Sequence, residues 1–246
     1  MKIIPLSEGS FTIDKSKLFI PFNTGVDNLQ NRPMGSLLVE IQPFVVVTSE
    51  DVLLIDTGLG FEVDGTPQIH KNLVANGINP GDVTKVLMTH LHKDHAGGVS
   101  MENKTSATKE LAFPEATYFI QKKELEFAFE KGLPSYIPEE LECLASASNI
   151  VLLNGNGVLE GYIKYEVTGA HSPFHQVFWI VDGGEKIFMG GDVAPQLHQM
   201  KSRFIAKYDY DGKKCIELIQ QWWKNGDEVR WTFLFYHDIK TPAFTF

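Results

Sequence analysis

Apolar positions in this chain fall into short runs that end at turns, and longer amphipathic segments separate these runs. Residues 44–47 and 52–55 are continuous apolar runs on either side of the polar turn 48–51, which predicts a hairpin of two buried strands. Further runs predict strands over 83–88, 116–121, 162–167, 177–181, 186–189 and 230–235. The segment 177–189 predicts a second hairpin, and 230–235 is expected to be the final strand.

The amphipathic segments predict helices over 68–76, 122–130, 138–147 and 211–224. Gly77 is placed to end the first of these helices. Each half of the chain therefore runs from strands to helices and back to strands. Two mixed sheets packed face to face, with helices outside, fit this order, so we expect an α+β fold in a single domain over residues 1–246.

Composition and charge narrow the range of partners. A hydrophobic fraction of 43% and a charged fraction of 22% are typical of a soluble globular chain. A net charge of -9 argues against nucleic acid, which requires a basic face. There is no signal-peptide pattern at the N-terminus and no apolar run near the ~18 residues of a membrane span, so we expect a cytoplasmic protein that acts on a small molecule away from membranes.

Two cysteines, Cys143 and Cys215, lie far apart in segments that are predicted to be helical. This spacing fits neither a zinc knuckle nor a disulfide framework. We interpret both side chains as buried free thiols.

The densest chemistry lies in residues 89–95, which read Thr-His-Leu-His-Lys-Asp-His directly after an apolar run. Imidazole and carboxylate are ordinary ligands for zinc, iron or manganese. In an extended segment His90, His92 and Asp94 would point the same way, while a turn would free His95 to face another point. One loop could therefore serve two metal ions.

Four more polar residues lie at or just beyond the end of an apolar strand. They are Asp56, His171, Asp192 and His237. Strand ends on one edge of a sheet converge, which brings distant residues together. Any one of the four alone would more often be a hydrogen-bonded core or surface group. Their combination with residues 90–95 favours a metal site.

The run from Thr89 to Gly98 matches the T-H-x-H-x-D-H-x-G-G motif of the metallo-β-lactamase superfamily at every position. The other landmarks follow in family order, with Asp56 in Leu-Ile-Asp-Thr-Gly, Asp192 in Gly-Gly-Asp and His237 before an aspartate. The chain resembles this superfamily from about residue 35 to the C-terminus. The resemblance implies a four-layer αββα sandwich.

The resemblance also implies the ligands of two divalent ions, zinc above all, with iron, manganese or cobalt as alternatives. The first ion would take His90, His92 and His171, the second Asp94, His95 and His237, and both would share Asp192. Asp56 is expected to orient the histidine loop without binding metal, and His175 either supports the ligands or serves the fold alone. Such a pair of ions can share a hydroxide, lower its pKa and polarise a substrate oxygen. Asp94 and Asp192 would thus be the carboxylates closest to the chemistry.

The segment from His171 to Gln176 resembles the H-T-P-G-H-Q run of N-acyl-homoserine-lactone lactonases, and residues 237–239 resemble their closing H-D-I. These likenesses favour a dinuclear hydrolase of a small ester or lactone. One departure stands out, because residues 193–195 read Val-Ala-Pro where those lactonases carry a tyrosine. Tyr208 and Tyr236 are the candidates to replace it.

Other activities of the same superfamily remain open. They are a phosphodiesterase, ribonuclease or organophosphate hydrolase, a glyoxalase-II-like thioesterase, a mononuclear iron enzyme such as a persulfide dioxygenase, and a non-catalytic metal-binding relative. The complete second ligand set argues against the iron enzyme, and the absence of a basic stretch argues against the ribonuclease and the thioesterase. Relatives in this family often form homodimers, so a homodimer is one of the states open to this chain, and the sequence does not decide its oligomeric state.

Overall fold

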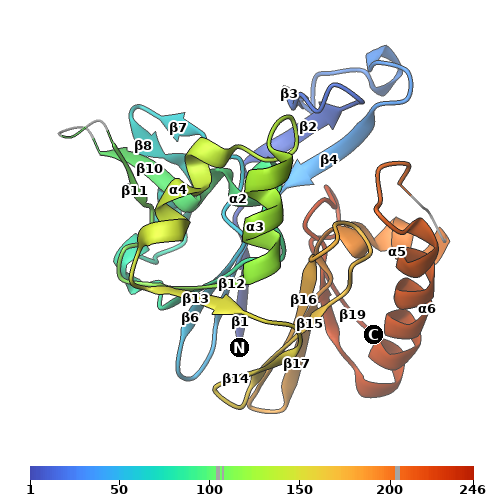
Figure 1. Ribbon diagram of the computed structural model, residues 1–246. Helices are drawn as coiled ribbons and strands as arrows, with labels where there is room; N and C mark the ends of the chain where they lie inside the picture. The colour runs from blue at the N-terminus through green and yellow to red at the C-terminus, as the bar shows by residue number, and fades with distance from the viewer. Residues whose placement is uncertain (104–105, 107, 203–205) are drawn as a thin grey trace.

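Two six-stranded mixed sheets form the centre of the computed structural model, which describes residues 1–103, 106, 108–202 and 206–246 (Figure 1). The first sheet has the spatial order β1 (Lys2–Pro5), β5 (Phe44–Val47), β6 (Val52–Ile55), β9 (Lys85–Leu87), β12 (Thr117–Gln121) and β13 (Ile150–Leu153). The second has the order β14 (Gly157–Leu159), β15 (Ile163–Val167), β16 (Gln176–Asp182), β17 (Glu185–Met189), β18 (Thr232–Leu234) and β19 (Ala243–Thr245).

Helices cover the outer faces of both sheets. On the first sheet these are α1 (Gln68–Ala75), α3 (Lys122–Lys131) and α4 (Pro138–Ser146), and on the second α5 (Leu197–Ser202) and α6 (Gly212–Val229). In Figure 1 the green and yellow helices lie on one side and the red α6 on the other. This is the predicted αββα arrangement of the metallo-β-lactamase fold, and the prediction is confirmed.

Successive side chains of each strand point to opposite faces of its sheet, and this alternation explains how the layers pack. In β5, Val45 faces the helices of the first sheet, whereas Phe44 and Val46 face the second sheet. Phe178 and Ile180 of β16 meet them from the other side. All of these side chains are buried, and burying one such side chain contributes roughly 1.5–3 kcal/mol. The core between the sheets therefore fixes the strand ends that carry the polar residues.

Helix α6 covers the second sheet with the predicted apolar stripe. Cys215, Ile219 and Trp222 are buried against Phe188 and Phe233. Both cysteines are free and buried on helices, as predicted. No helix in the described ranges combines the length and apolar character that a membrane crossing requires.

Smaller elements decorate this core. They are the three-stranded sheet β3 (Ile20–Pro21), β2 (Gly9–Ile13) and β4 (Leu37–Ile41), the hairpins β7 (Glu62–Val63) with β8 (Thr66–Pro67) and β10 (Ser100–Asn103) with β11 (Thr108–Leu111), the short helix α2 (Lys93–Ala96), and the 3-10 turns η1 (Leu29–Asn31), η2 (Pro80–Asp82), η3 (Gly97–Val99) and η4 (Gly191–Val193). The blue segment that joins β2 to β4 projects beyond the two main sheets (Figure 1).

The structure corrects two predictions about the elements. The strand at Thr232–Leu234 is not the last, because β19 pairs with it antiparallel through the register Phe233↔Phe244. The segment after β9 is extended only as far as His92, and helix α2 begins at Lys93. Asp94 therefore does not share the direction of His90 and His92, as an extended strand would require.

Candidate metal centre

The polar residues predicted from strand ends lie together at one edge of the two sheets. Asp56 follows β6, and His90 and His92 follow β9. Helix α2 carries Asp94 and His95. The remaining three positions belong to the second sheet, with His171 between β15 and β16, Asp192 in η4 after β17, and His237 after β18. The structure thus gathers all seven expected ligands into two groups that share Asp192.

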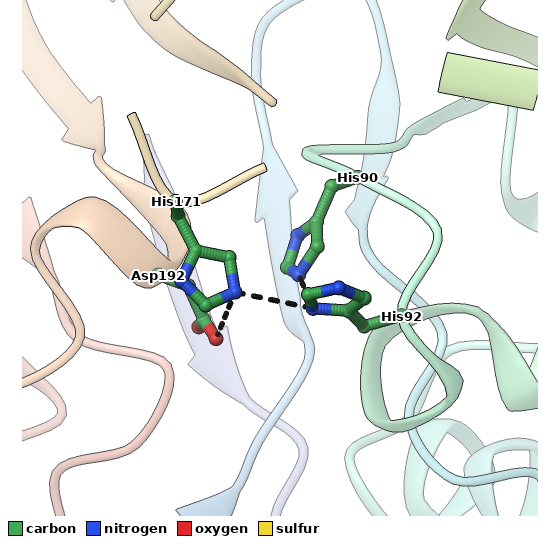
Figure 2. A group of neighbouring side chains, drawn as sticks. All are labelled: His90, His92, His171 and Asp192. Carbon is green, nitrogen blue, oxygen red and sulfur yellow. Dashed lines mark hydrogen bonds and ion pairs between the residues drawn. The ribbon is translucent and has the colours of Figure 1, made fainter. Parts of the chain in front are cut away.

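The first group holds three imidazoles and one carboxylate, drawn in Figure 2. His90 Nε2 lies 2.9 Å from His92 Nδ1, and His171 Nε2 lies 3.1 Å from the same nitrogen. Asp192 Oδ2 lies 3.3 Å from His171 Nε2. Three ring nitrogens aimed at one point match the donor set that a divalent transition metal takes in proteins.

The second group holds two imidazoles and two carboxylates, all of them buried or nearly so. Asp192 Oδ1 lies 3.1 Å from His95 Nε2 and 3.0 Å from His237 Nε2. Asp94 Oδ2 is farther out, at 3.8 Å from His95 Nε2 and 3.5 Å from His237 Nε2. Asp94 therefore joins this group and not the first.

Two buried atoms of the second group have no hydrogen-bond partner among the described residues. They are His95 Nε2 and Asp192 Oδ1. A buried polar atom without a hydrogen-bond partner costs about 1–3 kcal/mol, and a bound ion is one way to satisfy it. The residues present therefore fit a divalent metal ion, which would satisfy both atoms at once.

Burial and neighbouring charge separate the histidine pKa values. Burial, assisted by His95 and His92, holds the pKa of His90 well below its usual range, and burial with His171 does the same to His92. Burial also opposes a charge on His95, but the carboxylates of Asp192 and Asp94 outweigh it and raise the pKa of His95. Asp192 is itself buried, yet its histidine neighbours hold its pKa well below the usual value. His90 and His92 are thus held in the neutral form that binds metal, whereas His95 would release a proton when a metal ion binds.

Asp56 holds the histidine loop from behind. Its carboxylate accepts hydrogen bonds from the Thr89 backbone N–H and hydroxyl, each at 2.7 Å, and lies 2.8 Å from His95 Nδ1. Burial raises the pKa of Asp56, and the contact with His95 opposes this. Its backbone has φ of 57°, a conformation that aspartate tolerates better than most residues. The Asp56 carboxylate faces Nδ1 of His95, whereas the second group contains Nε2 of the same ring. This position is consistent with the expected role of Asp56 in orienting His95.

His175 lies beneath Asp192 and is fully buried. Its Nε2 accepts a hydrogen bond from the Asp192 backbone N–H at 3.2 Å, and its Nδ1 lies 3.1 Å from the Thr168 hydroxyl. Gly191 has φ of 50°, and a Cβ there would lie 2.5 Å from His175 Nε2. Glycine is therefore required for the imidazole to reach the backbone that carries Asp192.

Sequence reasoning missed two carboxylates that support the centre. Asp209 Oδ1 lies 2.9 Å from His171 Nδ1. Glu124 is fully buried and accepts hydrogen bonds from Leu91 N–H at 3.1 Å and from the Ser172 hydroxyl at 3.0 Å. Glu124 thus ties the loop of the first histidines to the loop of His171. Asp209 follows no predicted strand, and Glu124 lies inside the predicted helix 122–130, so the pattern of strand ends singled out neither residue.

The two tyrosines expected near the centre have different positions. Tyr236 is buried, its ring stacks on His95 with centroids 4.0 Å apart, and its hydroxyl donates to the Asp94 carbonyl at 2.7 Å. Tyr208 instead lines a pocket together with Asp192 and His237. Desolvation and the nearby carboxylate of Asp192 raise the pKa of Tyr208, so its hydroxyl keeps its proton. Only Tyr208 presents a side chain to the pocket.

Curated relatives match parts of the chain. The N-acyl homoserine lactonase AttM of Azorhizobium caulinodans is 40% identical over 55 residues, which are 22% of this chain and 17% of that protein. The probable metallo-hydrolase YybB of Bacillus subtilis is 28% identical over 144 residues, which are 58% of each chain. The match thus spans less than two thirds of either relative.

Solved structures resemble nearly the whole chain. A probable metal-dependent hydrolase from Staphylococcus aureus superposes with a TM-score of 0.78 and 22% identity, over 99% of this chain and 91% of that one. AidC, a dizinc quorum-quenching lactonase, gives a TM-score of 0.73 and 20% identity, over 98% of this chain and 88% of that one. At this level of identity the likeness establishes the fold.

The family model of the metallo-beta-lactamase superfamily matches residues 40–241. This range contains both sheets apart from their outermost strands β1 and β19, and every residue of the two groups. By the match, the fold and the paired histidine–aspartate groups, the chain belongs to the metallo-beta-lactamase superfamily.

Proposed function

We propose that this protein is a hydrolase with two divalent metal ions and that it cleaves a small ester or lactone. One observation carries the proposal: the two carboxylate oxygens of Asp192 face different groups. Oδ2 lies 3.3 Å from His171 Nε2, and Oδ1 lies 3.0 Å from His237 Nε2. A carboxylate placed in this way can bridge two ions, which a mononuclear centre would not need.

The two groups of side chains correspond to the ligand sets of two metal ions. His90, His92 and His171 would hold one ion, Asp94, His95 and His237 the other, and Asp192 both. When bound, such ions supply an activated water at neutral pH and polarise the oxygen of the scissile carbonyl. Because the nucleophile would be a water molecule, this chemistry needs no serine–histidine or cysteine–histidine pair.

Tyr208 supports an acyl substrate. Its ring lies 5.9 Å from that of His171, on the wall of the pocket. Because its pKa is raised, the hydroxyl donates a hydrogen bond and does not act as a base. A donor at this wall suits the oxygen that leaves when the acyl C–O bond breaks. The names of AttM and AidC, both lactonases, also support an ester or lactone bond.

The test is metal content and turnover in the same sample. Elemental analysis of protein purified without added metal should give two equivalents, and a panel of γ-lactones, aryl esters, thioesters and phosphodiesters should show turnover of the first two classes. His92→Ala should lose both metal and activity. His198→Gln is the matched control, because His198 is exposed and outside both groups. One equivalent of iron with no hydrolysis of the panel would contradict the proposal.

A further inference from the structure

Two lysines border the pocket that opens onto the metal groups. Lys17 and Lys93 line it together with His92, Asp94 and His237. Lys17 comes from the segment after β2, and Lys93 begins α2 between two expected ligands. Each is partly buried, so each presents an ammonium group toward the pocket mouth and not only to bulk solvent.

The position of Lys17 is fixed by a turn. Its backbone N–H donates to the Asp14 carbonyl at 3.0 Å, and the Asp14 carboxylate accepts from Ser16 N–H at 2.8 Å. The Lys17 Nζ lies 4.1 Å from the centroid of the Tyr208 ring. Such a cation–π contact holds the ammonium group beside the tyrosine that faces the metal groups.

Lys93 is held by the backbone on the other side of the mouth. Its N–H donates to the Ser135 carbonyl at 2.9 Å, and its Nζ lies 5.8 Å from the centroid of the Phe19 ring. Both lysines thus line the same pocket beside the metal groups.

Neither ammonium group forms an ion pair with a carboxylate of the described residues. Lys85 provides the contrast, since it is buried for structural reasons and pairs with Asp51 at 2.6 Å and Glu160 at 2.9 Å. The chain thus neutralises the buried Lys85 with two carboxylates, whereas Lys17 and Lys93 have no carboxylate partner among the described residues. Two ammonium groups on one pocket that lack a carboxylate partner are available to bind an anionic group of a ligand.

We infer that Lys17 and Lys93 bind an anionic oxygen group of the substrate, a carboxylate or a phosphate, beside the scissile ester or lactone bond. The inference rests on the proposed function and adds the substrate class to it. Two divalent ions would more than neutralise the carboxylates of Asp94 and Asp192, so the pocket would be positive overall. Ammonium groups bind carboxylate and phosphate as point charges, without demanding one geometry.

The test compares three γ-butyrolactones that differ only in the group on the carbon next to the ring oxygen. One bears a carboxylate, one a phosphomonoester on a hydroxymethyl arm, and one a neutral carboxamide. The metal-loaded protein should hydrolyse one anionic lactone with a kcat/KM at least about tenfold above that of the carboxamide, mainly through KM. The preferred anion identifies the group. Equal kcat/KM for all three would overturn the inference and leave the hydrolase intact.

Lysine variants locate the preference. Lys17→Met and Lys93→Met should each reduce the ratio of anionic to neutral kcat/KM by about tenfold. Methionine keeps the length of the side chain and, at Lys17, meets the same φ of 60° without a new backbone constraint. Lys224→Met is the control, because Lys224 lies on α6, outside the pocket, and pairs with Glu228 at 3.9 Å. Equal losses on all three lactones in the two pocket variants would overturn the assignment.

A binding measurement separates failure of the inference from failure of the proposed function. If neither the lactones nor the aryl esters are hydrolysed, the proposed function is wrong, and calorimetry with 5-oxoproline and its amide decides the inference. These are the lactam counterparts of the carboxylate and carboxamide lactones. Binding of 5-oxoproline at least about tenfold tighter than its amide, lost in Lys17→Met, would support the lysine site. Equal affinities would overturn it.

Discussion

His171 Nδ1 lies 2.9 Å from Asp209 Oδ1, so this carboxylate orients the imidazole and leaves Nε2 free to face His92 and Asp192. The hydrogen bond places the ring proton on Nδ1, which is the tautomer that binds metal through Nε2. Asp209 thus orients His171 in the same way that Asp56 orients His95. Asp56 follows strand β6, whereas Asp209 lies just before helix α6.

Replacing Asp209 should weaken the first metal site more than the fold. In Asp209→Ala the His171 ring loses its fixed tautomer, and we expect metal affinity to fall by about 10–100-fold. Competition with a chromogenic chelator measures this directly. Asp227→Ala is the control for charge, because Asp227 is exposed on α6. An affinity equal to that of the unmodified protein would show that Asp209 does not orient His171.

Asp56→Asn should lower hydrolysis by about tenfold or more while metal stays bound. The amide keeps the size of the carboxylate but has only one acceptor oxygen. It therefore cannot accept from the Thr89 backbone N–H, which bonds to Oδ1, and also from the Thr89 hydroxyl and His95, which bond to Oδ2, so the free energy of unfolding should fall by about 1–3 kcal/mol. Activity, metal content and urea unfolding are measured together. Asp51→Asn is a matched control, since Asp51 is a buried carboxylate that pairs with Lys85 away from the centre. Complete metal loss in Asp56→Asn would make Asp56 a ligand.

Asp192→Asn should disturb both metal sites at once. The variant retains one carbonyl oxygen, so it can serve one group but not bridge two, and the second equivalent of metal should dissociate at a chelator concentration at least about tenfold lower. Circular dichroism should remain unchanged, because the strand β17 and turn η4 do not depend on the carboxylate. Two equivalents bound with unchanged affinity would contradict the bridging role.

Sequence pattern was sufficient for the eight inner strands of the two sheets and for the polar residues at their ends, because both depend on local rules. It missed the four edge strands β1, β13, β14 and β19. The apolar run before residue 89 predicts a strand, and a strand end fixes where His90 emerges. It failed at Asp94, because the turn from extended to helical backbone after His92 depends on the carbonyl of Ser135, far along the chain, which receives the Lys93 N–H. Local periodicity contains no information about such a contact.

Asp209 and Glu124 show the other limit. Their roles depend on which loops meet at the metal centre, and loops lack the regular spacing of apolar residues from which a structure can be predicted. Glu124 lies in the first turn of α3, where a glutamate ordinarily faces solvent, yet here it is buried between Leu91 and Ser172. The missed strand β19 has the same cause, since only its pairing with β18 defines it.

Glu8 provides a test of stability against pH. It is buried, its carboxylate accepts from Leu59 N–H at 2.7 Å, and burial raises its pKa from 4.5 to about 7. A raised carboxyl pKa means that the folded state holds the proton more tightly than the unfolded state. The stabilisation is therefore complete below pH ~4.5 and is lost as the pH rises to about 7.

Glu8→Gln should remove this dependence, because glutamine does not titrate and its carbonyl can still accept from Leu59. The free energy of unfolding of the variant, relative to the unmodified chain, should rise by up to about 3 kcal/mol between pH 4.5 and 8. Taking the difference between the two proteins cancels the titration of groups that they share. A difference that stays constant over this range would mean that folding does not raise the pKa of Glu8.

Each metal group draws on both sheets. His90 and His92 follow the first sheet and His171 and Asp192 the second, and the second group is divided in the same way. A bound ion would therefore fasten one half of the sandwich to the other. At a free metal concentration one hundred times the dissociation constant, binding adds about 2.7 kcal/mol to folding. We expect the lifetime of the chain against proteases to follow the supply of metal in its surroundings, so that starvation for the ion removes the protein as well as its activity.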